Sequence, residues 1–217
     1  MRLKIALTFD DAFKSQYYVA TLLASKGIKA TFFVPVCLEK HPADAEPLLS
    51  LQEVEEISRM GHEIGSHGCR HANLLSVSYD EILREVRDSK ELLEEAIGRE
   101  MYGFAYPYGF YDHKVIDLVK QYYDYAVTVH LKRIKNCKKL IYTSHIDERD
   151  KYTLCRLAPK SLFYAVPKLF SSLAMKAEEI KIILVFHNEK PWLIITMLNI
   201  LRNIFNARFY TVRELLG

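Results

Sequence analysis

Short apolar segments alternate with segments of helical apolar spacing along most of this 217-residue chain. The apolar segments are typical of buried strands, because they are short, often β-branched or aromatic, and bounded by Gly, Pro or polar residues. Strands are expected at residues 3–9, 30–34, 62–67, 102–106, 125–129, 180–187 and 209–211. Helices are expected at residues 17–26, 50–60, 78–97, 112–122 and 192–205. This alternation predicts an α/β fold in which helices cover parallel strands.

Residues with chemically useful side chains lie at the carboxyl ends of four of these strands. Asp10 and Asp11 follow the first strand, His67 ends the third, the turn Pro107–Gly109 follows the fourth, and His187 ends the sixth. In folds of this class the site forms where the parallel strands end. A flat sheet would keep these side chains apart, so we expect an incomplete or distorted (β/α) barrel. Neighbouring strand residues point to opposite faces, so both carboxylates share one cavity only if the chain turns directly after the strand.

Two histidines and the acidic pair have the composition of a metal site. His67 and His71 are four residues apart, so their rings can face one ion if the chain turns helical after Ser66. Two His and one Asp leave positions open on a divalent ion, which is the pattern of a catalytic site. Cys69, between the two histidines, is the alternative ligand. For the histidine pair taken alone, coincidence is the alternative, and for the Asp pair alone, capping of the next helix.

Four stretches together resemble the motifs of the polysaccharide deacetylase family, also called the NodB-homology group or carbohydrate esterase family 4. The stretches are Thr8-Phe9-Asp10-Asp11, His67-Gly68-Cys69-Arg70-His71, Pro107-Tyr108-Gly109 and Val185-Phe186-His187. They match, in the family's order, its T-F-D-D, H-[ST]-x-x-H, R-x-P-Y-G and L-x-H motifs, with Gly68 for Ser or Thr and Val185 for Leu. The resemblance covers residues 3–129 and 180–213, and it implies a barrel of the NodB-homology type.

The resemblance also implies a role for each matched side chain. Asp11, His67 and His71 would bind one divalent metal ion, which we expect to be zinc. Asp10 would be the general base that takes a proton from the attacking water. His187 would be the general acid that protonates the departing amine.

The turn after the fourth strand follows the family pattern only in part. The family holds the oxyanion with the backbone N–H of its motif Tyr, here Tyr108, and Pro107 belongs to the same substrate-binding turn. The motif arginine, which restrains the base, falls on Ala105, and the family's Asp-Trp motif near the fifth strand is absent. Arg156 is an isolated cation in an apolar setting, and a buried guanidinium needs a carboxylate partner. We therefore hypothesise that Arg156 reaches the site and pairs with the base; a surface or structural ion pair is the alternative.

The composition excludes some classes of protein. A net charge of +3 is too small to argue for nucleic acid, and no nucleic-acid-binding motif is present. The four cysteines are scattered, which predicts free thiols in a reducing compartment. No apolar run reaches transmembrane length, and the chain enters its first strand by Leu3 without a signal peptide. A cytoplasmic protein with a single catalytic domain over residues 1–217 is therefore expected.

Two stretches leave alternatives open. Residues 130–179 begin with a basic cluster, and they are either a solvated loop region or a rim that attracts an acidic substrate. The helix at 192–205 is strongly apolar with Arg202 as its only cation. Packing against the barrel wall is favoured there over a peripheral contact with a membrane.

The resemblance therefore implies a metal-dependent hydrolase that removes an N-acetyl group from an amino sugar, in a polysaccharide or a lipid-linked sugar precursor. One alternative is an amidase or deformylase on the same scaffold. An alternative of another class is a catalytically silent carbohydrate-binding domain, although a binder would need neither Asp10 nor His187. The expected partner is an N-acetylated sugar, and the sequence carries no signal for the oligomeric state.

Overall fold

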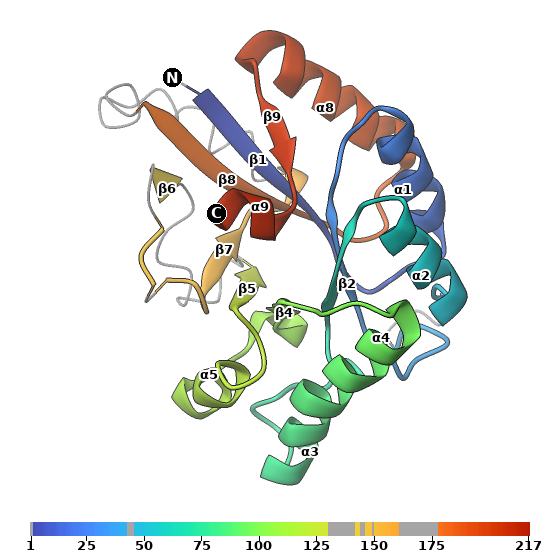
Figure 1. The fold of residues 1–217 in the computed structure, drawn as a ribbon, viewed down its shortest axis with the longest axis vertical. Coiled ribbons are helices and arrows are strands. Elements are labelled where there is room, and N and C mark those ends of the chain that lie inside the picture. The colour runs from blue at the N-terminus through green and yellow to red at the C-terminus, as the bar shows by residue number, and fades with distance from the viewer. Residues whose placement is uncertain (1, 43–45, 130–141, 144–145, 149, 161–177) are drawn as a thin grey trace.

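The computed structural model describes residues 2–42, 46–129, 142–143, 146–148, 150–160 and 178–217 (Figure 1). The first elements in chain order are β1 (Arg2–Phe9), α1 (Ser15–Ser25), β2 (Thr31–Val34), α2 (Leu51–Arg59), β3 (Glu63–Ser66), α3 (Tyr79–Leu83), the π-helical segment η1 (Arg84–Asp88), α4 (Ser89–Ile97), β4 (Gly103–Ala105), the 3₁₀ turn η2 (Pro107–Gly109), α5 (His113–Val119) and β5 (Tyr125–Val129). The later elements are β6 (Tyr142–Thr143), β7 (Leu154–Arg156), β8 (Glu179–Phe186), α8 (Pro191–Phe205), β9 (Arg208–Tyr210) and α9 (Val212–Leu216).

The strands form one sheet in the order β6-β8-β1-β2-β3-β4-β5-β7, and β9 also pairs with β1. All of these pairings are parallel except that of β6 with β8. The longest ladder joins β1 to β8, from Arg2 opposite Glu179 to Phe9 opposite Phe186. The two strands that lead into Asp10 and His187 are therefore aligned along their whole length.

The sheet closes on itself just after β7. The Leu157 N–H donates to the Ile183 carbonyl at 2.9 Å, and the Val185 N–H donates to the Leu157 carbonyl at 3.0 Å. This isolated bridge joins the end of the β7 segment to β8. The predicted distorted (β/α) barrel is confirmed, and its closure gathers the strand ends that carry the candidate site.

Side chains alternate between two apolar clusters along β1. Ile5, Leu7 and Phe9 belong to the cluster that contains buried residues of α1, α2, α4 and α8. Ala6, between them, belongs to a second cluster that fills the barrel with side chains from β2, β4, β5 and β8. Both faces of β1 are therefore buried, which explains its nearly continuous apolar sequence. Each Leu or Ile side chain removed from water in this way contributes roughly 1.5–3 kcal/mol.

Capping boxes begin two of the predicted helices. They join Ser50 with Glu53 and Ser78 with Glu81, each with both reciprocal hydrogen bonds. The helix expected over residues 78–97 is less regular than predicted, because its middle turn is the π-helical segment η1. It ends at Gly98 in the left-handed conformation, as a C-terminal glycine allows.

The prediction of free thiols is wrong. Cys37, just after β2, forms a disulfide bond with Cys69, just after β3, and Cys155 is also disulfide-bonded. The pairing was not visible in the sequence because the two cysteines are 32 residues apart. They meet because β2 and β3 are neighbours in the sheet. The cysteines therefore do not support a reducing compartment.

The apolar helix α8 packs on the barrel through Ile194, Leu198 and Leu201, as the sequence favoured. Among the described residues, no helix is both long enough and apolar enough to span a membrane. The basic residues that open the segment 130–179 lie outside the described residues.

Candidate metal and active site

The chain turns sharply as it leaves β1, which brings two consecutive carboxylates into one cavity. The Asp10 N–H still donates to the Phe186 carbonyl at 2.9 Å, so Asp10 continues the ladder with β8. Asp11 and Ala12 then adopt positive φ angles of 71° and 54°. This is the turn that two consecutive carboxylates need to share one cavity. The buried Gln16 side chain donates to the carbonyls of Asp10 and His187 at 2.6 and 2.8 Å and links the two strand ends.

Asp11, His67 and His71 form a buried cluster with the composition of a metal site. The Asp11 Oδ1 atom lies 3.4 Å from Nε2 of His67 and 3.3 Å from Nε2 of His71. The ligand atoms that the three residues offer lie within 4.8 Å of one another. The three residues are therefore a possible site for a divalent ion.

The surroundings of the two imidazoles fit this assignment. The His67 Nδ1 atom is 2.8 Å from the Ala105 carbonyl. A proton on that nitrogen leaves Nε2 as the free lone pair, which is the usual arrangement of a metal-binding histidine. The buried His71 Nδ1 has no hydrogen-bond partner within the described part of the chain.

The loop that carries the two histidines is not the helical turn that their spacing would allow. Residues 67–71 have no regular secondary structure, and Gly68 and His71 have φ angles of 81° and 53°. An irregular loop brings the rings together instead, with their centroids 4.7 Å apart. Cys69 is in the disulfide with Cys37, so its sulfur is not a free thiolate and the alternative of a cysteine ligand is excluded.

Arg156 lies against Asp10, the contact hypothesised from the sequence. Its guanidinium is fully buried and donates from Nη1 to Oδ1 at 2.5 Å and from Nη2 to Oδ2 at 2.6 Å. Nη1 also donates to Thr8 Oγ1 at 3.1 Å. The arginine comes from the end of β7 and not from the Ala105 position of the family motif.

The buried charges determine the protonation of the acidic pair. Burial alone would raise the pKa of Asp10, but the Arg156 guanidinium and His67 outweigh it and hold that pKa below its ordinary value. Burial likewise opposes ionisation of Asp11, and His67 overcomes it, so the pKa of Asp11 is far below its usual range. Burial and the neighbouring His67 lower the pKa of His71 to about 3. Asp10 and Asp11 are therefore ionised and His71 neutral. Burial disfavours the charged form of His67, but the two carboxylates outweigh burial and raise the pKa of His67, so a metal ion would have to displace a proton from that ring.

These groups open into a cavity of about 390 Å³ that Tyr106, Tyr108, Phe110 and His187 also line. Tyr108 has a positive φ of 59°, and its half-exposed ring packs against His71 with centroids 4.5 Å apart. Pro107 is buried in the same turn and is not among the residues that line the cavity. His187 is exposed at the end of β8.

Sequence reasoning missed His41 as a residue of the site. Its Nε2 lies 3.7 Å from Asp11 Oδ2, on the opposite oxygen from the one that faces His67 and His71. His41 belongs to no motif and comes from the segment between β2 and α2, where no regular pattern signals a site.

The family model for polysaccharide deacetylases matches residues 2–126. Among curated proteins, an uncharacterised 30.6 kDa protein of Geobacillus stearothermophilus is 28% identical over 124 residues, which are 55% of this chain and 43% of that protein. The chain spans less than half of the length of the curated relatives that it matches.

Solved structures show the same fold at low sequence identity. A CE4 family pseudoenzyme from Bacillus anthracis has a TM-score of 0.67 and 18% identity over 100% of this chain and 66% of its own. A structure described as T48 deacetylase with substrate has a TM-score of 0.60 and 19% identity over 97% of this chain and 89% of its own. The chain belongs to the polysaccharide deacetylase family, as its motifs suggested.

Proposed function

We propose that the protein is a metal-dependent amide hydrolase that removes the N-acetyl group of an amino sugar in a polysaccharide or a lipid-linked precursor. The observation that carries the proposal is that Asp11, His67 and His71 cluster in one cavity with Asp10 and His187. Membership of the polysaccharide deacetylase family supports this class of reaction.

The donor set suits a divalent ion, which we take to be zinc. Two imidazole nitrogens and one carboxylate oxygen are ligands that zinc prefers, and three protein ligands leave room for water and substrate. When bound, the ion would act as a Lewis acid and lower the pKa of water. Asp11, His67 and His71 would hold it, while the Ala105 carbonyl fixes the orientation of the His67 ring.

Asp10 is suited to act as the general base. It is buried beside the cluster, with Oδ2 at 3.8 Å from His67 Nε2, and its pKa is held low chiefly by Arg156. An ionised carboxylate in this position can accept a proton from the attacking water. The bidentate contact with Arg156 fixes the plane of the carboxylate, so the acceptor oxygen is held in place before the substrate arrives.

His187 and the Tyr108 turn supply the other requirements of amide hydrolysis. His187 reaches the cavity from the end of β8 and would donate a proton to the leaving nitrogen. The backbone N–H of Tyr108 would donate to the oxyanion. The left-handed backbone at Tyr108 turns the chain at the cavity wall, next to the ring of His71.

The cavity favours a sugar as the acyl carrier. Its volume of about 390 Å³ is near the lower end of the roughly 300–1,000 Å³ range of small-molecule sites. Tyr106, Tyr108 and Phe110 give part of its wall an aromatic surface, on which an apolar sugar face can pack. An amidase or deformylase acting on another C–N bond would use the same polar groups. The aromatic part of the wall is therefore the feature that favours a sugar substrate.

The rival from another class is a domain that binds carbohydrate without catalysis. One structural neighbour is described as a pseudoenzyme, so the fold alone does not decide. The Asp10–Arg156 pair and His187 favour catalysis, because binding of a neutral sugar requires neither a buried ionised base nor a histidine at this position.

The experiment that tests the proposal is a panel assay with zinc-loaded protein. N-acetylglucosamine oligomers, N-acetylated monosaccharides, N-formyl sugars and a non-sugar acetamide are incubated with wild type and with the Asp10→Asn variant. Acetate or formate release is measured. The proposal predicts acetate from an N-acetyl sugar with wild type only. Binding of these sugars without release by either protein would support the silent carbohydrate-binding domain and overturn the proposal.

A further inference from the structure

The loop 67–71 has no regular secondary structure, yet each of its first four backbone N–H groups has an acceptor. The His67 N–H donates to the Val34 carbonyl at 2.9 Å, and the Gly68 N–H donates to Ser66 Oγ at 3.0 Å. The next two N–H groups both donate to one side chain, that of Glu85. Buried backbone donors need acceptors, so the loop depends on Glu85 for half of this set.

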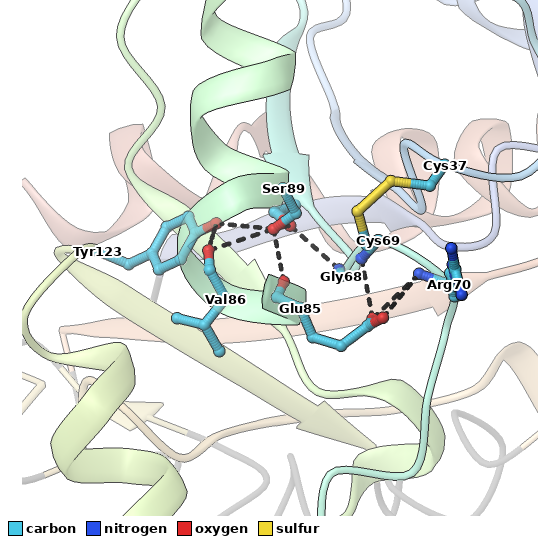
Figure 2. The surroundings of a disulfide bond; sticks show 9 residues. Cys37, Gly68, Cys69, Arg70, Glu85, Val86, Ser89 and Tyr123 are labelled. Carbon is cyan, nitrogen blue, oxygen red and sulfur yellow. Dashed lines mark hydrogen bonds between the residues drawn. A yellow bond between two sulfur atoms is a disulfide. The ribbon is translucent and has the colours of Figure 1, made fainter. Parts of the chain in front are cut away.

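Glu85 is a buried carboxylate that faces the loop from η1 (Figure 2). Its Oε2 accepts from the Cys69 N–H at 2.8 Å, and both oxygens accept from the Arg70 N–H at 3.0 Å. Hydrogen bonds to a carboxylate are stronger than bonds between neutral groups. The carboxylate therefore holds the two residues that directly precede His71.

The local helix geometry brings Glu85 to this position. η1 is a π-helical segment between α3 and α4, and such segments change the direction of side chains relative to a regular helix. Ser89 reinforces the segment by donating from Oγ to the Glu85 carbonyl at 2.6 Å and contacts Ser66 Oγ at 2.7 Å. Tyr123 donates to the Val86 carbonyl at 2.9 Å. The network therefore connects the π-helical segment and α4 to Ser66 at the end of β3 and, through Glu85, to the loop (Figure 2).

Gly68 is matched to Glu85. A Cβ atom at Gly68 would lie 2.4 Å from Glu85 Oε2, and the φ of 81° disfavours any side chain there. The carboxylate thus occupies the space that a Ser or Thr at this motif position would need. The glycine at position 68, where the family motif has Ser or Thr, therefore leaves the space that the Glu85 carboxylate fills.

The opposite side of the loop is held by β2 and its extension. The Val36 and Cys37 N–H groups donate to the Gly68 and Cys69 carbonyls at 3.1 and 2.8 Å, and the disulfide joins Cys37 to Cys69. Glu85 acts on the other edge, where none of the strands that the structure describes pairs with the Cys69 and Arg70 N–H groups. His71 follows with a positive φ of 53°, a conformation that a non-glycine residue keeps only where its surroundings enforce it.

We propose that Glu85 is a positioning residue for the metal site, acting through the backbone of Cys69 and Arg70 to hold His71 against His67 and Asp11. The proposal rests on the proposed metal site but not on the proposed reaction. Loss of the carboxylate frees the loop on one side, so that the His71 ring is no longer held where its Nε2 meets the other two ligand atoms. The expected consequence is weaker binding of zinc, by about 10- to 100-fold, as for other groups that orient metal ligands.

The test measures zinc affinity by competition with a chromophoric chelator, in metal-stripped wild type and in the Glu85→Gln, Glu85→Ala and Glu85→Asp variants. Glu85→Gln keeps the size of the side chain but places an amide NH₂ group against the loop donors, and a weaker affinity is expected. Glu85→Asp keeps the charge and should recover part of the affinity. Glu95→Gln is the matched control, because Glu95 is exposed on the same helical stretch, and its affinity should equal that of wild type.

A second control distinguishes a positioning role of Glu85 from a merely structural one. Leu215→Ala removes a buried side chain of α9, outside the loop network, and its melting temperature is measured with those of the Glu85 variants. If Glu85 positions the ligands, Glu85→Gln loses far more zinc affinity than Leu215→Ala at a comparable fall in melting temperature. Zinc affinity within twofold of wild type in folded Glu85→Gln and Glu85→Ala protein would overturn the proposal. A loss in Glu85→Gln no greater than in Leu215→Ala would also overturn it. Both readouts are independent of deacetylase activity.

Discussion

Arg156 and Asp10 form a bidentate ion pair inside the barrel, with 2.5 Å between Nη1 and Oδ1 and 2.6 Å between Nη2 and Oδ2. Arg156 lies at the end of β7, which is not paired with β1. Its guanidinium is also 5.4 Å from the centroid of the Phe33 ring. The arginine of the family motif would fall on Ala105, at the end of β4. Here a cation at the end of β7 pairs with Asp10 instead.

We expect Arg156→Met to destabilise the protein by about 3–5 kcal/mol, because it leaves the Asp10 charge buried and unpaired. The low pKa of the Asp10 carboxyl in the folded state contributes stability above its ordinary pKa of 3.8. That contribution is lost as pH falls through the folded-state pKa. The difference between wild type and Arg156→Met should therefore be largest near neutral pH and shrink in acid. Urea unfolding of metal-free protein at several pH values measures it.

Arg208→Met is the control for the loss of an arginine, since Arg208 is exposed on β9, and it should change stability by less than about 0.5 kcal/mol. In the Asp10→Asn background the effect of Arg156→Met should be smaller, because no buried charge remains to be paired. Equal effects of Arg156→Met in the two backgrounds would show that the pair is not coupled.

Asp10→Asn and His187→Ala should each lower turnover by about 10²- to 10⁴-fold, the usual contribution of a general base or acid. Neither residue belongs to the Asp11, His67 and His71 cluster, so both variants should still bind one equivalent of zinc. The loss in His187→Ala should be greatest for substrates with poor leaving amines. Steady-state kinetics together with metal analysis measure both quantities, and near-normal turnover in either variant would remove that residue from the mechanism.

Glu63 should make the stability of the barrel depend on pH. Loss of hydration raises the pKa of this carboxyl above its ordinary value of 4.5, although the side chain accepts hydrogen bonds from Thr31 and Tyr125. The folded state therefore binds the proton more tightly, and stability falls as pH rises from 4.5 through the folded-state pKa. The difference in unfolding free energy between wild type and Glu63→Gln should decline over that range. A difference that is constant with pH would contradict the expectation.

Removing the disulfide should cost stability without removing a metal ligand. Cys37 and Cys69 are separated by 32 residues, and the chain-entropy estimate for a loop of that size is about 3–4 kcal/mol. The Cys37→Ser/Cys69→Ser variant should unfold at correspondingly lower urea concentration and still bind one zinc ion. The double variant is preferable to a reductant, which would also act on the disulfide of Cys155. Loss of metal stoichiometry in the variant would contradict this expectation and show that the disulfide is needed to hold the loop that carries His67 and His71.

The strand ends and their polar residues could be predicted because their signals are local. β5 begins and ends at the predicted residues, and both capping boxes were legible as Ser and Glu three residues apart. The parallel direction of the strands followed from the alternation of strands and helices. The proximity of Asp10 and Arg156 was suggested only because an arginine in an apolar segment demands a partner.

The parts that the sequence did not reveal depend on tertiary contacts. The π-helical turn at Glu85 has no local signature, and the spacing of His67 and His71 suited a helical turn equally well. The Cys37–Cys69 disulfide required knowledge of which strands are neighbours. His41 reaches Asp11 from a segment without regular structure, where residue type alone gave no reason to select it.

Deacetylation should depend on a metal ion that the Asp11, His67 and His71 cluster binds. The most direct test measures acetate release from N-acetylglucosamine oligomers by chelator-stripped protein, before and after addition of one equivalent of Zn²⁺, with His71→Ala in parallel. We expect no release from stripped wild type, restored release after zinc, and none from His71→Ala at the same zinc concentration. Full release by stripped wild type, or by His71→Ala, would contradict it.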